Sequence, residues 1–248
     1  MRLALGTVQF GMPYGIANEN GQVNREEARK IITLARSNGI EILDTAINYG
    51  ESEVCLGEIG IKGFDMVTKL PALPEKVENI DKWVNDQIEA SLKRLNLESL
   101  YATLIHCPEQ LLNSRGEALW ISLKKLKDFG IIKKIGVSIS DPTELNYLTN
   151  TFHIDLIQAP FNIVDQRLLL SGWLEKLAFL NIEVHTRSAF LQGLLLMPLA
   201  KIPDKFKFWL PLFDTWHKWL NKKKLTAAEA CISFVQAHPE VNRIVVGV

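Results

Sequence analysis

The sequence predicts an eight-stranded α/β barrel, in which helices follow parallel strands in alternation. Short apolar runs alternate with amphipathic segments from residue 3 to residue 247, no linker interrupts them, and eight of the runs have the length of a strand. We therefore expect one domain over residues 1–248, a (β/α)8 TIM barrel. A doubly wound open sheet is the alternative, although no G-x-G-x-x-G motif follows the first run.

The first half of the chain contains four predicted strands and their helices. Asn24 is expected to cap the first helix in a capping box with Glu27, and Gly39 to end it. Apolar spacing of three or four residues marks the helices, and short apolar runs mark the strands. The pairs are Leu3–Thr7 with Arg25–Asn38, Ile40–Asp44 with Glu51–Ile59, Met66–Lys69 with Asn79–Leu95, and Leu100–His106 with Glu117–Phe129.

The second half repeats this order. Strands are predicted over Ile135–Ser138, Leu156–Ala159, Glu183–Arg187 and Arg243–Gly247, and helices from Asp141-Pro142 onward, over Leu168–Leu180 and over Ala227–Ala237 after the cap Thr226. A long connection from Gly193 to Leu225 is rich in aromatic residues. We expect it to form a helix that buries these side chains on the barrel, with a lid or a pocket wall as alternatives. They are Phe206, Phe208, Trp209, Phe213, Trp216 and Trp219.

The chain ends at Val248, directly after the eighth predicted strand, so the last helix of a complete barrel is missing. Without that helix, outward side chains such as Ile244 and Val246 are expected to meet water at roughly 25 cal/mol per Å². Such a patch is uncommon on a soluble monomer. We expect a partner or a further C-terminal segment to cover this end of the barrel.

Composition argues against several classes of protein. The 28 basic and 28 acidic residues cancel, so neither nucleic acid nor a membrane is an expected partner, and the run Lys222–Lys224 is interpreted as a solvated helix end. Cys55, Cys107 and Cys231 have no paired spacing, which favours a reducing compartment. The sequence contains neither a signal peptide nor an apolar stretch of membrane-spanning length, so we expect a cytoplasmic protein.

Polar residues occupy the ends of the predicted strands, where barrel enzymes carry their chemistry. Lys69 would be costly to bury alone, so we expect it to pair with Asp44 on the neighbouring strand. Structural roles remain open, among them a turn cap for Asp44, a core position for His106 and a loop aromatic for Tyr49. The combination within one sector of the barrel favours an active site. The strand-end residues are Gly6, Thr7, Asp44, Lys69, His106, Ser138, Gln158 and Arg187.

These segments resemble the aldo-keto reductase family. LDTAINYGESEVCLGE is similar to the family signature D-T-A-x-x-Y-G-x-x-E-x-x-x-G-E, VTKL to its lysine strand, LIHCPE to its histidine strand and LGTVQFG to its opening segment. The resemblance extends from Leu3 to Gly247, and the subtype is similar, to a lesser degree, to bacterial reductases associated with polysaccharide biosynthesis.

The resemblance implies an NAD(P)H-dependent reductase of aldehydes or ketones, with a sugar derivative as a candidate substrate. Tyr49 would act as the general acid and protonate the alkoxide that hydride transfer creates. Lys69 would lower the phenol pKa from about 10, and Asp44 would hold Lys69 in position. His106 would orient the carbonyl oxygen. The implied catalytic residues are thus Asp44, Tyr49, Lys69 and His106.

The implied cofactor is NADPH, with NADH as an alternative. Two positions depart from the family pattern: Ile139 follows Ser138 where an asparagine is frequent, and Arg187 replaces a tyrosine that stacks on the nicotinamide. A guanidinium can also stack on a ring, although it would repel a cationic nicotinamide. The implied cofactor residues are Gly6, Thr7, Asp44, Ser138, Gln158, Arg187, Ser188 and Gly193, with Asn162 as a further candidate.

Other functions are less well supported. No H-x-H pair ends a strand, so we expect no metal site. Cys107 and His106 would point to opposite faces of a strand, which argues against a cysteine nucleophile, and His185 is interpreted as barrel interior. The main alternative is a non-catalytic protein of the same fold that binds a nicotinamide nucleotide to sense redox state or to regulate a partner.

Overall fold

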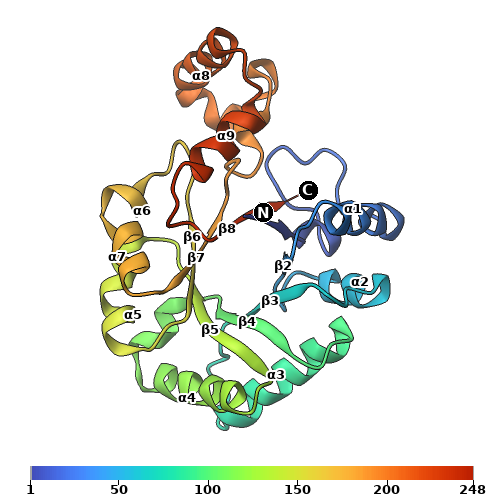
Figure 1. Ribbon diagram of the computed structural model, residues 1–248, viewed down its shortest axis with the longest axis vertical. Helices are drawn as coiled ribbons and strands as arrows, with labels where there is room; N and C mark the ends of the chain where they lie inside the picture. Colours follow the sequence, from blue (N-terminus) through green and yellow to red (C-terminus); the bar gives the residue numbers. More distant parts are fainter. Residues whose placement is uncertain (1, 248) are drawn as a thin grey trace.

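The computed structural model describes residues 2–247 and contains a closed barrel of eight parallel strands (Figure 1). Neighbouring strands follow chain order, and β8 pairs with β1 to close the barrel. The predicted (β/α)8 architecture is confirmed; Met1 and Val248 lie outside the described residues. The strands are β1 (Leu3–Gly6), β2 (Ile42–Asp44), β3 (Asp65–Leu70), β4 (Leu100–Ile105), β5 (Ile132–Ser138), β6 (Leu156–Pro160), β7 (Glu183–Arg187) and β8 (Arg243–Gly247).

Helices surround the barrel, and one of them differs from the prediction. The expected helix Leu168–Leu180 is two helices, because Gly172 has a φ of +73° and a left-handed residue interrupts a right-handed helix. Asn24 caps α1 through the Glu27 amide, 3.0 Å away. The helices are α1 (Arg25–Ser37), α2 (Ser52–Ile59), α3 (Ile80–Leu95), α4 (Ser114–Asp128), α5 (Leu145–Thr151), α6 (Arg167–Leu170), α7 (Trp173–Phe179), α8 (Leu210–Lys223) and α9 (Ala227–Gln236).

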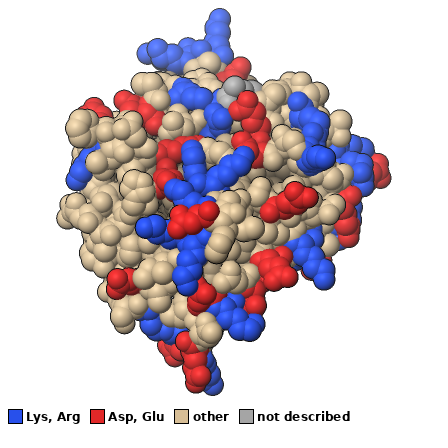
Figure 2. Space-filling view, turned by 60° about the horizontal axis from the view of Figure 1, so that its bottom comes forward, with Lys and Arg blue, Asp and Glu red and all other residues tan. Residues whose placement is uncertain are grey.

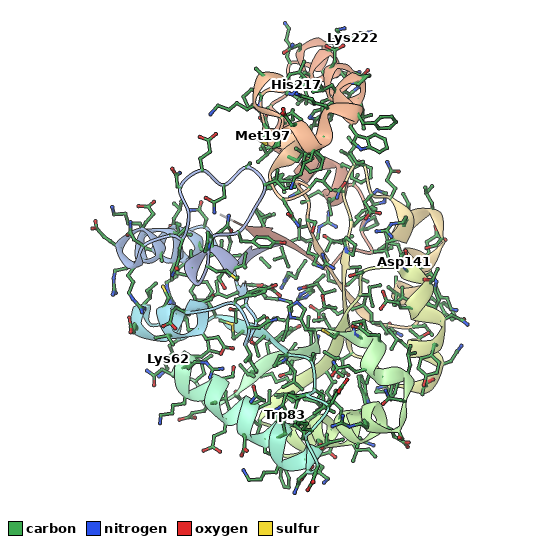
Figure 3. All side chains as sticks on the ribbon, turned by 180° about the vertical axis from the view of Figure 1, so that it is seen from behind. Lys62, Trp83, Asp141, Met197, His217 and Lys222 are labelled. Atoms are coloured by element: carbon green, nitrogen blue, oxygen red, sulfur yellow. The ribbon has the colours of Figure 1, made fainter. Side chains whose placement is uncertain are left out.

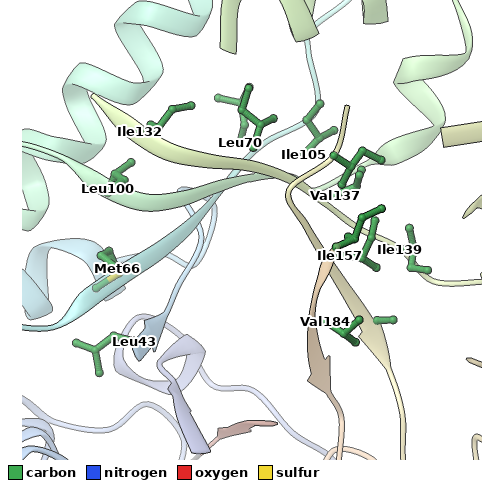
Figure 4. Close-up of a cluster of buried hydrophobic side chains, with 14 of the residues drawn as sticks. Leu43, Met66, Leu70, Leu100, Ile105, Ile132, Val137, Ile139, Ile157 and Val184 are labelled. Atoms are coloured by element: carbon green, nitrogen blue, oxygen red, sulfur yellow. The ribbon is translucent and has the colours of Figure 1, made fainter. Parts of the chain in front are cut away.

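Side chains alternate between the two sides of each strand and build two apolar clusters. The larger cluster lies between the strands and the helices and includes Leu43, Met66 and Leu100 (Figure 4). The smaller one draws its members from six of the strands: Ala4, Ile42, Val67, Ala102, Leu104, Leu156 and Val245. Polar residues occupy strand positions before and after this smaller cluster, as described below.

The outer face of β8 is better covered than the sequence suggested. Ile244 is fully buried and belongs to the same cluster as Val235 of α9, while Val246 is half-buried. Arg2 holds the loop after α9 against the start of β1, because its guanidinium donates to the carbonyl oxygens of His238 at 2.7 Å and Val241 at 3.1 Å. The expected exposure of Ile244 is therefore wrong.

Residues 194–224 form a lobe around α8 that stands away from the barrel (Figures 1 and 3). In this α8 lobe Phe213 is buried, and Trp216 donates to the Leu195 carbonyl oxygen at 3.0 Å. Both belong to an apolar cluster that also contains Cys231 of α9 and residues of the loops after β1, β6 and β7. Phe208 is 83% exposed and Trp209 53%. The expected packing of the aromatic side chains on the barrel is therefore only partly present.

The surface carries both signs of charge. Lysine and arginine side chains alternate with aspartate and glutamate over the face in Figure 2, in agreement with the equal totals of the sequence. Cys55, Cys107 and Cys231 are free thiols. From residue 2 to residue 247, no helix has the length and apolar character that a membrane crossing requires.

Candidate active site

An ion pair between Lys69 and Asp44 lies at the buried centre of the barrel mouth. The Lys69 Nζ is 2.6 Å from Asp44 Oδ1 and donates a second hydrogen bond, of 2.8 Å, to the carbonyl oxygen of Thr45. Only 1% of the Lys69 side chain and 6% of the Asp44 side chain are exposed. The expected pairing is thus present, and it satisfies a lysine that would otherwise be costly to bury.

A chain of polar contacts continues from this pair across the barrel. Gln158 of β6 donates from Nε2 to the second carboxylate oxygen of Asp44 at 2.7 Å. Ser138, at the end of β5, donates to the Gln158 amide oxygen at 3.5 Å. All of these side chains are buried. Asp44 therefore connects the predicted catalytic lysine to two predicted cofactor residues, a link that the sequence did not predict.

Tyr49 and His106 complete this centre. Tyr49 lies in the loop after β2, with the Lys69 Nζ 5.0 Å from the centre of its ring. The Tyr49 ring meets the His106 ring edge to face, with 5.8 Å between their centres. Within residues 2–247, the buried Nδ1 of His106 has no hydrogen-bond partner. The structure thus brings together the four residues that the sequence predicted to be catalytic.

Buried hydroxyl groups fix the loop that carries Tyr49. Ser52, at the start of α2, lies 3.0 Å from the hydroxyls of both Thr7 and Thr45 and donates to the Thr7 carbonyl oxygen at 2.8 Å. Gly50 has a φ of +52°, and a Cβ there would meet a backbone carbonyl oxygen of the loop after β1 at 2.3 Å. The signature residues around Tyr49 therefore fasten its loop to β1 and β2.

Glu53 anchors the other side of the same loop. It is 1% exposed, and its carboxylate accepts hydrogen bonds from Thr68 at 2.7 Å, Ser91 at 2.7 Å and Arg94 Nε at 2.8 Å. One carboxylate thus ties α2 to β3 and α3. The partners of Glu53 are distant from it along the chain, so the sequence does not reveal these contacts. The glutamate of the signature motif is the one sequence feature that points to them.

Burial dominates the acidity of both candidate proton donors. It raises the pKa of Tyr49 above the ordinary value of 10.0, while the charge of Lys69 lowers that pKa by less. The expected net lowering is therefore wrong, because desolvation of a phenolate outweighs a lysine charge that Asp44 already balances. Burial, followed by the charge of Lys69, lowers the pKa of His106 to about 4, so its imidazole is neutral near pH 7.

A cavity of about 950 Å³ opens at this centre, within the size range of ligand sites. Its wall contains every predicted site residue except Lys69, which is almost completely buried, and the further candidate Asn162. From residue 2 to residue 247, no group of three histidine, cysteine, aspartate or glutamate side chains could hold a metal ion. The predicted residues in the wall are Gly6, Thr7, Asp44, Tyr49, His106, Ser138, Gln158, Arg187, Ser188 and Gly193.

The loops after β1 and β7 both line this cavity and contact each other. The Ile16 amide donates to the Gln192 carbonyl oxygen at 2.9 Å. Gly193 has a φ of +86°, and a Cβ there would lie 2.6 Å from the Cβ of Ala17. A glycine is therefore required at residue 193 by both its backbone conformation and its close neighbour.

Asn162 supports this wall from behind. Its Nδ2 donates to the Ser188 carbonyl oxygen at 3.0 Å, and its Oδ1 accepts from the amides of Val164 and Asp165. Asn162 is fully buried and is not part of the cavity wall. The polar atoms of Asn162 are thus used to hold Ser188, whose φ is +62°. A direct contact between Asn162 and a cofactor is therefore not supported.

The two departures from the family pattern contact each other. Arg187, the last residue of β7, donates from Nη2 to the carbonyl oxygen of Ile139 at 3.0 Å. The Ile139 side chain is fully buried, whereas Arg187 is half-buried in the cavity wall. An arginine thus stands at the mouth, near His106, whose pKa its charge helps to lower.

The rival cysteine site is not supported. Burial, followed by the charge of Glu109, raises the pKa of Cys107 above 9.0. The thiol therefore stays protonated at neutral pH and is a poor nucleophile.

Sequence comparison gives the same family as the motifs. The profile of the aldo/keto reductase family matches residues 2–248. The chain belongs to the aldo/keto reductase family. The aldo-keto reductase YhdN of Bacillus subtilis is 26% identical over 178 residues, which cover 67% of this chain and 52% of that protein. Chloroplastic pyridoxal reductase of Arabidopsis thaliana is 30% identical over 141 residues, which cover 48% of this chain and 37% of that protein. The aligned region spans about half or less of these curated relatives.

Solved structures of other members share the barrel of this aldo/keto reductase family member. The holo form of an aldo-keto reductase from Bacillus halodurans has a TM-score of 0.78 at 19% identity, covering 100% of this chain and 82% of that chain. Glycerol dehydrogenase from Gluconobacter oxydans has a TM-score of 0.73 at 23% identity, with the same coverages. At these identities the likeness establishes the fold.

Proposed function

We propose that this aldo/keto reductase family member is an NAD(P)H-dependent reductase of aldehydes or ketones. One observation carries the proposal: the buried Lys69–Asp44 pair of 2.6 Å adjoins Tyr49 and His106 in a cavity of about 950 Å³. A strongly perturbed group beside a charge pair in a cleft is typical of acid–base chemistry.

Each of these side chains has a distinct part in the proposed reaction. When bound, the nicotinamide cofactor supplies the hydride. Tyr49, which its raised pKa keeps protonated, donates its proton to the carbonyl oxygen as negative charge develops there. Lys69 stabilises the resulting phenolate, and Asp44 holds Lys69 charged and in place. Neutral His106 donates a hydrogen bond to the same oxygen and orients it.

The cavity wall suits a nicotinamide and its ribose. The hydrogen bond from Ser138 to Gln158 is long, at 3.5 Å, so both side chains can exchange it for a carboxamide. Arg187, whose guanidinium can lie flat against a ring, completes this side of the wall. We assign cofactor binding to Gly6, Thr7, Asp44, Ser138, Gln158, Arg187, Ser188 and Gly193, with NADPH or NADH as the cofactor.

The cavity wall also carries carboxamide side chains, those of Gln9, Asn48 and Gln192. Such groups hydrogen-bond hydroxyls, so a hydroxylated carbonyl compound, such as a sugar derivative, is the proposed substrate.

The test is cofactor oxidation, followed by near-ultraviolet absorbance, with matched panels of sugar aldehydes and alkyl aldehydes of equal length. We expect turnover with NADPH or NADH and higher kcat/KM for the hydroxylated members. Cofactor binding, measured by fluorescence titration, with no turnover on any carbonyl would contradict the proposal and favour a nucleotide-binding regulator.

A further inference from the structure

The guanidinium of Arg187 carries a charge that the described chain does not balance. Its one hydrogen bond goes from Nη2 to the neutral carbonyl oxygen of Ile139, and no carboxylate of residues 2–247 forms an ion pair with it. Arg187 is also the sole lysine or arginine among the described residues of the cavity wall. Its Nε and Nη1 thus remain as donors within a half-buried site.

The other charges of the cavity are already paired. Asp44 pairs with Lys69, and Glu19, on the loop after β1, lies 2.9 Å from the Nζ of Lys201. Glu27, in the first turn of α1, lies 3.7 Å from the Nζ of Lys30. His106 is neutral near pH 7. The catalytic end of the cavity therefore has a net charge of about +1, and Arg187 is its source.

Arg187 shares the cavity with the residues that would act on a carbonyl. Tyr49, His106 and Arg187 all belong to the wall of the same cavity. The charge of Arg187 also makes a small contribution that lowers the pKa of both Tyr49 and His106, although burial has the larger effect on each and raises that of Tyr49. Tyr49 and His106 are the two residues that would contact the carbonyl oxygen.

A half-buried cation with no counter-charge has lost hydration and regains stabilisation when an anion binds. The guanidinium presents a planar fork of donors that matches a carboxylate or a phosphate, and it cannot be neutralised by deprotonation. A neutral substrate would leave this charge unbalanced inside the cavity.

We infer that the substrate is an anionic carbonyl compound, whose carboxylate or phosphate group binds Arg187 while Tyr49 and His106 hold its carbonyl oxygen. This inference rests on the proposed reductase activity and adds the class of substrate. The diphosphate of the cofactor is the other source of the same chemistry, and the experiment separates the two.

The kinetic test compares aldehydes that carry an anionic group with neutral aldehydes of matched carbon skeleton. The pairs are glyoxylate with acetaldehyde, succinic semialdehyde with butanal, and glyceraldehyde 3-phosphate with glyceraldehyde. We expect a higher kcat/KM for the anion in at least one pair, and Arg187→Gln to reduce that anionic preference at least tenfold, mainly through KM. Arg187→Lys should restore part of it, because the charge remains while the fork is lost. Arg29→Gln, on the exposed surface of α1, is the charge-matched control and should leave the preference unchanged.

A binding test needs no turnover. Succinamate and butanamide are unreactive analogues of succinic semialdehyde and butanal, and calorimetry should show tighter binding of succinamate, lost in Arg187→Gln. The inference is overturned if Arg187→Gln changes both members of every pair equally. It is also overturned if the variant weakens cofactor binding and leaves the anionic preference unchanged, since the cofactor is then the only ligand of Arg187. Turnover without anionic preference contradicts this inference alone, whereas absence of turnover with selective succinamate binding contradicts the reductase proposal alone.

Discussion

The barrel interior holds a polar cluster at each end. The basal cluster centres on Glu183, the first residue of β7, which accepts from the Tyr101 hydroxyl at 2.8 Å and also pairs with Lys134. The other Glu183 oxygen lies 2.7 Å from Nε2 of the fully buried His185, as expected for a residue of the barrel interior. We call these four residues the basal cluster, and Asp44, Lys69, Ser138 and Gln158 the mouth cluster.

The two clusters contain the same kinds of groups but leave different atoms free. Each has a lysine–carboxylate pair, and each has a tyrosine near its lysine. The Tyr101 hydroxyl is hydrogen-bonded to both Lys134 and Glu183, whereas the Tyr49 hydroxyl has no hydrogen bond within residues 2–247. No basal residue belongs to the wall of the large cavity. A buried ion pair alone therefore does not identify an active site; an unbonded proton donor facing a cavity does.

The largest effect is expected from Lys69→Met. It leaves the Asp44 carboxylate buried with Gln158 as its remaining donor, and removal of one partner of a buried ion pair costs roughly 3–5 kcal/mol. Activity should collapse near neutral pH, with the residual rate shifted to a different pH range. Urea unfolding and the pH–rate profile measure these effects. The double variant Asp44→Asn/Lys69→Met should regain stability without activity; recovered activity would exclude the pair from catalysis.

Tyr49→Phe should reduce kcat/KM at least about 100-fold, the lower end of the range for general acid catalysis. The free energy of unfolding should change by less than about 0.5 kcal/mol, because the hydroxyl forms no hydrogen bond in the folded protein. The matched control is Tyr101→Phe in the basal cluster. It should lose about 1 kcal/mol of stability and keep its activity. Equal activities for the two variants would rule out Tyr49 as the proton donor.

Glu183→Gln should destabilise the protein by about 1–3 kcal/mol, because Lys134 and His185 lose the carboxylate that they share. We expect kcat/KM to remain within about twofold of the original value, since the cluster is at the opposite end of the barrel. Chemical denaturation and steady-state kinetics on the same preparations test this prediction. A large loss of activity at unchanged stability would show that the basal cluster reaches the active site.

The smallest effect separates the clusters by pH. His106 at the mouth has a pKa lowered to about 4 from 6.5, so the unfolded chain binds its proton first and stability falls as pH drops from 6.5 towards 4. Burial alone would raise the pKa of Glu183, but hydrogen bonds from His185 and Lys134 lower it to about 2 from 4.5, so its contribution is complete above 4.5 and is lost towards 2. His106→Asn should flatten the first range and Glu183→Gln the second, as measured by unfolding free energy against pH. Identical curves for both variants would contradict this division.

Much of the fold could be predicted from local patterns. Short apolar runs located all eight strands, because the strands of a barrel are buried on both faces. The break at Gly172 coincides with a Ser-Gly pair within an otherwise helical pattern. A glycine can adopt either sign of φ, so the sequence alone does not show that the helix ends there. The position of the α8 lobe could not be predicted. Aromatic residues indicate that a segment will be partly buried, but they do not indicate which part of the protein will cover it.

In the candidate site, too, some features follow from the sequence and others only from the tertiary structure. The sequence by itself determined the residue types and their positions: Asp44, Lys69 and His106 at the ends of strands and Tyr49 in the loop after one of them, because parallel strands of a barrel all end on one face. Only the tertiary structure decided the contacts between them: the bond from Gln158 to Asp44, the anchoring of Glu53 and the unbalanced charge of Arg187. Burial also reversed the expected shift in the pKa of Tyr49. Hydrogen bonds and desolvation depend on atoms that are distant along the chain and meet only when the barrel closes.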